Sequence, residues 1–279
     1  MRLLDLKDIS ERYMELINPS CPEKLLQVGR VLGLSPHSRV IDFGCGFAEM
    51  LSLWADHYGI SGVGIDIREH ACQRARAKVE ARGLADRIQI ICGDAARHQF
   101  EKRSFDVAVC LGASFIWDGF RPTVQAMRSA IKLEGNLVVG EPHWLHDHVP
   151  PEYVCQEQSF HSERELLQIV REEGFDLLYV VRASHDDWDR YQSDNWYGLV
   201  HWLQDNQDHP ERQEVLEHLH SSQDEYFRYG RQYLGWAIYL FTPAADDISR
   251  SCHFERSEES LSATAKPLLA GRDASLHSA

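Results

Sequence analysis

Residues 39–50 read RVIDFGCGFAEM, and this stretch decides the fold. A short apolar run at its start is typical of the end of a buried strand, and Gly44 and Gly46 then predict a sharp turn. A helix is expected to start near Phe47, with its apolar side toward the core. Glycines in such a turn let a ligand lie directly on the main chain. The stretch therefore predicts a strand, a glycine turn and a helix that together bind a small, flat ligand.

The charges around this turn favour a cationic ligand. Dinucleotide enzymes also use a G-x-G turn, but their fingerprint needs a glycine or alanine where this chain has Glu49. Asp42 before the turn and Glu49 after it place carboxylates where a pyrophosphate needs N–H donors and a helix dipole. An NAD-linked oxidoreductase is therefore disfavoured, and a turn that binds nothing remains the plain structural alternative.

The pattern D-x-G-x-G-x-A at residues 42–48 resembles the E/D-x-G-x-G-x-G loop of the class I S-adenosylmethionine-dependent methyltransferases. Their cofactor carries a sulfonium and an ammonium group, which suits two neighbouring carboxylates. The resemblance implies that the cofactor-binding residues of this loop are Asp42, Gly44, Cys45 and Gly46.

The next strand also ends in an acid. ISGVGIDI at 60–67 is a continuous apolar run that places Asp66 20 residues beyond Gly46. In this architecture the carboxyl end of the second strand lies beside the glycine turn, so Asp66 can accept both hydroxyls of a ribose. Ile67 follows it at the same edge. Asp66 can also cap the helix that begins near Arg68, and the two roles are compatible.

Two further strands complete the expected cofactor site. RIQIICGDAA at 87–96 ends in Asp94 and Ala95, and the resemblance implies that they contact the adenine amino group and ring. Asp94 as a plain turn residue is the alternative. SFDVAVCLGAS at 104–114 would bring Cys110 and Leu111 under the sulfonium and the reacting methyl. This strand end lacks the D/N-P-P-Y/F motif with which similar enzymes grip a flipped nucleobase.

The segment after the fifth strand supplies the candidate catalytic groups. A helix is expected over 119–132 and a turn over 133–135, followed by the strand NLVVGEP at 136–142, which ends at Glu141. The loop at 142–160 is aromatic, proline-broken and rich in histidine. Glu141 and His143 are candidate polar groups facing the substrate, although a structural role for Glu141 is equally compatible with the sequence. A metal site formed with His146, Asp147 and His148 is less favoured, because their spacing matches no metal motif. No metal is expected.

The resemblance extends along most of the chain. VIDFGCGFAEM, GVGIDI, GDAA, CLGASFI and GEPHW occur in the order and spacing of the class I methyltransferases. DDWDRYQSDNW and YGRQYLGWAIYLF are similar to the bacterial YjhP-like group, so that the likeness covers about residues 9–242. It implies a Rossmann-like α/β three-layer sandwich with a seven-stranded, mostly parallel sheet of order 3-2-1-4-5-7-6. Its last strand would be antiparallel, after a helical insertion.

Composition changes mark the expected domain organisation. Residues 1–35 are expected to form a helical cap whose first helix ends near Asn18 and either packs on the sheet or covers the cofactor. The core should comprise 36–184 and 233–244. Residues 185–232 would be a helical insertion serving as a substrate lid or a dimer contact. The aperiodic, serine-rich stretch at 245–279 is expected to be disordered and dispensable.

The overall charge limits the classes of partner that the protein is expected to bind. A formal charge of −14 disfavours nucleic acids and anionic membranes, since both would repel the protein. The seven cysteines form no C-x-x-C pair, and no leader or membrane-spanning stretch is visible, so a soluble cytoplasmic monomer or homodimer is expected.

The predicted function follows from these features together. It is S-adenosylmethionine-dependent methylation of a small molecule by direct in-line transfer, with S-adenosylhomocysteine as product. The alternative is a non-catalytic regulatory protein that binds the same cofactor.

Overall fold

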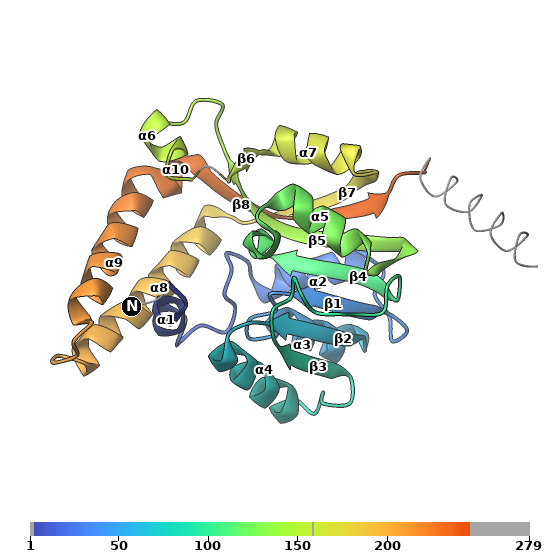
Figure 1. Cartoon of the computed structure of the whole chain (residues 1–279), viewed down its shortest axis with the longest axis horizontal. Coiled ribbons are helices and arrows are strands. Elements are labelled where there is room, and N and C mark those ends of the chain that lie inside the picture. The colour runs from blue at the N-terminus through green and yellow to red at the C-terminus, as the bar shows by residue number, and fades with distance from the viewer. Residues whose placement is uncertain (1–2, 158, 246–279) are drawn as a thin grey trace, which may run out of the picture.

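The computed structural model describes residues 3–157 and 159–245, which fold around one central sheet (Figure 1). Its strands are β1 (Arg39–Phe43), β2 (Ser61–Asp66), β3 (Ile88–Cys92), β4 (Phe105–Leu111), β5 (Ile131–Trp144), β6 (His161–Ser162), β7 (Phe175–Arg182) and β8 (Leu234–Pro243). The order is β3-β2-β1-β4-β5-β8-β7, and β8 runs antiparallel to both of its neighbours. The predicted order is confirmed, because the short strand β6, paired with β5, shifts the later numbers by one.

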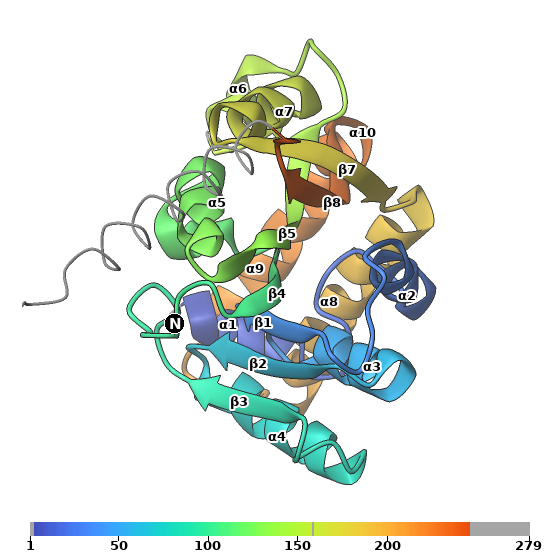
Figure 2. The ribbon, with the colours of Figure 1, turned by 90° about the vertical axis from the view of Figure 1, so that its right-hand side faces the viewer.

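Helices cover both faces of the sheet, as expected for a three-layer sandwich (Figure 2). The helices of the described residues are α1 (Leu3–Ser10), α2 (Pro22–Val31), α3 (Glu49–Tyr58), α4 (Glu69–Ala81), η1 (Ser114–Trp117), α5 (Phe120–Arg128), α6 (Pro151–Val154), α7 (Glu163–Glu172), α8 (His185–Asp205), α9 (Arg212–Glu225), η2 (Tyr226–Gly230) and α10 (Arg231–Tyr233). One apolar cluster joins α5 and α7 to the sheet, and a second joins α2, α3 and α4 to its other face.

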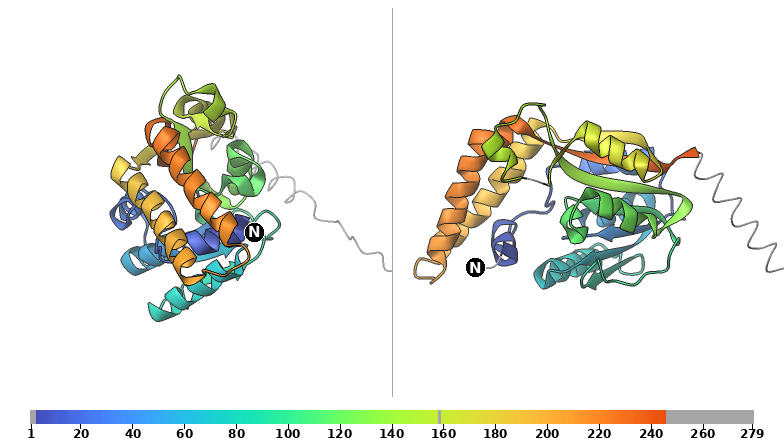
Figure 3. Two further views of the ribbon diagram at one scale, coloured as in Figure 1. Left: turned by 90° about the vertical axis from the view of Figure 1, so that its left-hand side faces the viewer. Right: turned by 45° about the horizontal axis from the view of Figure 1, so that its top comes forward.

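The helical insertion stands outside these layers. Helices α8 and α9 form a hairpin with its own apolar cluster, and Figure 3 shows this hairpin beside the core with α1 next to it. Leu6 and Ile9 of α1 pack against that cluster. A Cβ atom on Gly198 of α8 would lie 2.2 Å from the carbonyl oxygen of Ser10, so only glycine permits this approach. The first helix therefore packs on the insertion, and its expected packing on the sheet is wrong.

The predicted end of the first helix is also wrong, since α1 stops at Ser10. The guanidinium of Arg74 on α4 donates to the carbonyl oxygens of Glu11, Arg12 and Met14, at 3.2, 3.2 and 2.7 Å. These contacts replace the helical hydrogen bonds that a longer helix would make. Residues 14–21 instead run without helical structure toward the glycine turn.

Two other boundaries differ from the prediction because the backbone leaves helical geometry. Helix α3 begins at Glu49 and not near Phe47, since Gly46 and Ala48 have positive φ values of 53° and 55°. Strand β5 already begins at Ile131, where a helix and then a turn were expected. At the position of the expected turn the strand forms a bulge, because residues 132–135 have no partner in the pairing of β5 with β4.

Two expectations concern the rest of the chain. None of the helices in the described ranges is long and apolar enough to cross a membrane. The stretch predicted to be disordered, 245–279, lies outside the described residues from position 246 onward.

Candidate functional site

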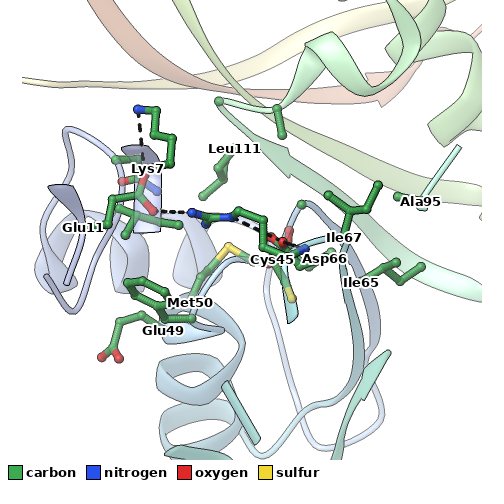
Figure 4. Close-up of a pocket in the computed structure, with 18 of the residues that line it drawn as sticks. Lys7, Glu11, Cys45, Glu49, Met50, Ile65, Asp66, Ile67, Ala95 and Leu111 are labelled. Atoms are coloured by element: carbon green, nitrogen blue, oxygen red, sulfur yellow. Dashed lines mark hydrogen bonds and ion pairs between the residues drawn. The ribbon is translucent and has the colours of Figure 1, made fainter. Parts of the chain in front are cut away.

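A cavity of about 410 Å³ opens at the carboxyl edge of the sheet. The glycine turn, the ends of β2, β3 and β4, and residues 111–113 and 115–116 supply its wall on the core side. Residues between Lys7 and Asn18 and the ring of Tyr191 on α8 close it from outside the core. Figure 4 shows Lys7 and Glu11 on one side of the cavity and Ala95 on the other, with Asp66 between them. The cavity is therefore assembled from the core, the N-terminal segment and the insertion together.

Most of the predicted cofactor residues meet at this cavity. It is lined by Asp42, Gly44, Cys45, Asp66, Ile67, Asp94, Ala95 and Leu111. Of the remaining two, Gly46 contributes its backbone N–H to the carboxylate of Asp66 at 2.9 Å. Cys110 is fully buried in the core and lies outside the lining. The contacts predicted with adenine, ribose and sulfonium stay predictions.

Gly44 and Gly46 are required by close contacts with other parts of the protein, which the sequence does not show. A Cβ atom on Gly44 would lie 2.7 Å from Cβ of Ala113, and one on Gly46 would lie 2.3 Å from Cδ1 of Ile17. Both residues also have positive φ. Packing of the protein against itself therefore requires glycine here, in addition to any need of a ligand.

Asp66 holds the turn and the N-terminal segment together. Its Oδ1 accepts the N–H of Arg68 at 2.9 Å, and its Oδ2 accepts the N–H of Gly46. The guanidinium of Arg68 donates to Glu11 at 2.6 Å and lies 3.5 Å from Asp8. Glu11 is buried, so this pair is shielded from solvent. The acid expected to bind ribose is thus tied, through Arg68, to the segment that covers the cavity.

The two acids flanking the turn differ from the expected pair of open carboxylates. Glu49 is paired with Lys78 at 2.5 Å and lies 3.6 Å from Arg82. Burial, and secondarily the nearby charge of Asp66, raise the pKa of Asp42 to about 8. The charge of Glu49 is thus neutralised by Lys78 and Arg82, and the carboxyl groups left to face a cation are those of Asp42 and Asp66.

Asp94 serves the local turn and still faces the cavity. Its Oδ1 accepts the N–H of Ala96 at 2.9 Å, and its Oδ2 lies 3.2 Å from Arg97. Asp94 therefore stabilises the turn, as the alternative interpretation held. The predicted adenine contact is compatible with this role, because Asp94 and Ala95 both line the cavity.

The candidate catalytic groups lie behind the cavity wall. Glu141 accepts a hydrogen bond from Ser114 Oγ at 2.8 Å, and its Oε2 has no partner among the described residues. Burial raises the pKa of Glu141 to about 7, and the bond from Ser114 opposes this rise. His143 is buried, with Nδ1 3.0 Å from the hydroxyl of Tyr239. Burial lowers the pKa of His143. Neither Glu141 nor His143 lines the cavity.

Sequence reasoning missed the lining residues that come from outside the core. Lys7, Glu11 and Tyr191 became part of the site only through packing of α1, the segment after it and α8, whereas Arg68 directly follows the predicted Ile67 after β2. The signal for Tyr191 was present in DDWDRYQSDNW, a motif outside the cofactor loops. As for metals, no cluster of three or more His, Cys, Asp or Glu side chains in the described ranges is placed to hold an ion.

Comparison with known proteins points in one direction. Residues 40–135 match the family model described as a methyltransferase domain. The chain is 32% identical over 236 residues to the uncharacterised protein YjhP of Escherichia coli, covering 83% of this chain and 95% of that one.

Two similar proteins have solved structures with a bound ligand. A SAM-dependent methyltransferase from Geobacter sulfurreducens, crystallised with S-adenosyl-L-homocysteine, superimposes with a TM-score of 0.80 at 35% identity, covering 86% and 98% of the two chains. A SAM-dependent methyltransferase from Thiobacillus denitrificans, crystallised with the same ligand, superimposes with a TM-score of 0.79 at 33% identity. The match covers 87% of this chain and 100% of that one.

Proposed function

The chain belongs to the class I S-adenosylmethionine-dependent methyltransferases, and we propose that it methylates a small molecule by direct transfer. The observation that carries this proposal is the covered cavity of about 410 Å³ at the edge of the sheet. A cavity of this size falls in the range of small-molecule sites. Lys7, Glu11, residues 15–18 and Tyr191 cover one side of it, which leaves less room for a macromolecular acceptor than an uncovered sheet edge would. The charge of −14 also disfavours a nucleic-acid acceptor.

The residues of the cavity fit the cofactor. Asp66 is available to the ribose, Asp94 and Ala95 to the adenine, and Leu111 lies at the β4 end where the reacting group is expected. Asp42 presents a buried oxygen that has no partner among the described residues. When bound, the cofactor supplies an electrophilic methyl carbon on a sulfonium. The chain's own contribution is to position the two reactants, which is worth roughly 7 to 11 kcal/mol when they are held at reacting distance.

Glu141 is the better of the two candidate bases. A general base works best with a pKa near the working pH, and the Glu141 carboxyl meets that condition with a pKa of about 7. One of its oxygens has no partner within residues 3–157 and 159–245. His143 lies between Tyr239 and Glu163, and burial lowers its pKa. An oxygen or protonated nitrogen acceptor would need such a base, and Ser114 is the contact between Glu141 and the cavity wall. A thiol acceptor would need little help beyond deprotonation.

The acceptor can be identified with a labelled methyl donor. Purified protein is incubated with cell extract and isotopically labelled S-adenosylmethionine, and mass spectrometry finds the metabolite that gains the label. We expect one small-molecule product that disappears with Asp66→Ala. Label in protein or nucleic acid would contradict the proposed acceptor class. Cofactor binding without any labelled product would favour the regulatory alternative.

A further inference from the structure

Two buried oxygens face the same cavity without a hydrogen-bond partner in the described part of the chain. They are Oδ1 of Asn18 and Oδ1 of Asp42. Asn18 is 8% exposed and Asp42 is 4% exposed, so neither oxygen is compensated by bulk water. A buried acceptor without a donor costs free energy. Both oxygens therefore indicate a donor that enters with a ligand.

Asn18 is held beside the glycine turn by its neighbours in the chain. Ile17 packs against Gly46, and the backbone oxygen of Asn18 accepts the N–H of Ser20 at 2.8 Å. Upstream, Arg74 fixes the carbonyl groups that follow α1. The amide of Asn18 thus projects into the cavity from a fixed segment, on the same side as the turn that follows Asp42.

We propose that Asn18 Oδ1 accepts a hydrogen bond from the α-ammonium group of S-adenosylmethionine and, together with Asp42, forms the site for that group. The cofactor brings three kinds of donor, which are the adenine amino group, the ribose hydroxyls and the ammonium. Asp94 and Asp66 lie at the ends of β3 and β2, on the side expected to bind the nucleoside. The ammonium is the donor that remains for the glycine turn.

The cations of the cavity do not compete for this role. Arg68 is paired with Glu11 at 2.6 Å, and Lys7 lies 3.8 Å from the same glutamate. Asn18 and Asp42 are therefore free to receive an incoming cation. This inference involves the cofactor alone and no acceptor, so its failure would leave the small-molecule proposal unchanged, and the reverse also holds.

Calorimetric binding of S-adenosylhomocysteine, which keeps the ammonium, tests the inference. Asn18→Leu keeps the size of the side chain and removes the acceptor, and its affinity should fall by about ten- to a hundredfold, as for a hydrogen bond to a charged group. Affinity for 5′-methylthioadenosine, which lacks the amino-acid part, should stay unchanged. The matched control is Ser20→Ala, because Ser20 is also buried in the same segment but does not line the cavity. This control should bind both ligands as the parent does.

Asn18→Asp tests whether the side chain of Asn18 accepts a hydrogen bond from the cofactor or donates one to it. It keeps an acceptor and removes the amide donor, so binding of S-adenosylhomocysteine should be retained. Loss of binding in Asn18→Asp would mean that the amide donates to the cofactor carboxylate, and it would overturn the inference. Equal loss of both ligands in Asn18→Leu would also overturn it, because the residue would then only support the fold of the segment. Retained binding of S-adenosylhomocysteine by Asn18→Leu would do the same.

Discussion

Asp42→Asn should stabilise the ligand-free protein increasingly as the pH rises. The carboxyl of Asp42 is buried beside Asp66, and its pKa rises from 3.8 to about 8. Between these values the folded state binds a proton that the unfolded state has lost, so the stability of the parent protein falls with rising pH. At 1.36 kcal/mol per pH unit, the free energy of unfolding should gain roughly 2.7 kcal/mol from the substitution between pH 5 and pH 7. The full interval to pH 8 sets an upper bound of roughly 6 kcal/mol.

The measurement is denaturant unfolding at pH 5, 6, 7 and 8, followed by tryptophan fluorescence. The quantity of interest is the difference in unfolding free energy between variant and parent at each pH. Asp86→Asn is the control, because Asp86 is exposed, and its difference should stay constant over the same range. A difference for Asp42→Asn that is also constant would refute the reasoning, since the Asp42 carboxyl would then ionise normally in the folded protein.

The same substitution should have the opposite effect on the cofactor. An ammonium group beside Asp42 favours its ionised form, so binding of S-adenosylhomocysteine should release a proton and should tighten by up to about tenfold per pH unit below pH 8. Asp42→Asn should bind more weakly and without this pH dependence. The buried acid is thus expected to lower stability and to raise affinity.

Three further predictions concern the cavity wall. Arg68→Met removes the closer partner of the buried Glu11 and leaves only Lys7, 3.8 Å away, so it should cost up to about 3 to 5 kcal/mol in denaturant unfolding. A loss below about 1 kcal/mol would speak against a shielded ion pair. Ser114→Ala removes the hydrogen bond that lowers the pKa of Glu141, so the rising limb of the pH profile of kcat should move to higher pH, and an unmoved limb would remove Glu141 from catalysis. Phe115 lines the cavity and is 72% exposed. Phe115→Ala should therefore raise the KM for the acceptor about tenfold, as measured by initial rates. The affinity for the cofactor, measured by calorimetry, should stay constant.

The sequence by itself determined the run of strands and helices and the expected place of the cofactor, and the resemblance to the methyltransferases implied the order of the strands. Alternation of apolar runs with helical stretches fixes a parallel sheet, and residues at the ends of neighbouring parallel strands must meet at one edge. Asp42, Asp66 and Asp94 could therefore be assigned to one site. These features depend on short stretches of chain, each of which carries its own pattern.

Only the tertiary structure decided what surrounds those acids. Glu49 resembles an open carboxylate in the sequence, but Lys78 of α4 neutralises it. Asn18 was expected at the end of a helix that either packs on the sheet or covers the cofactor. It lies in the cavity wall but in a non-helical segment, because α1 packs on the insertion and Arg74 binds the carbonyl groups that follow it. Tyr191 reaches the same cavity from far along the chain. Charge pairing, burial and pKa depend on contacts between residues distant in sequence, and no local pattern encodes which distant residues those will be.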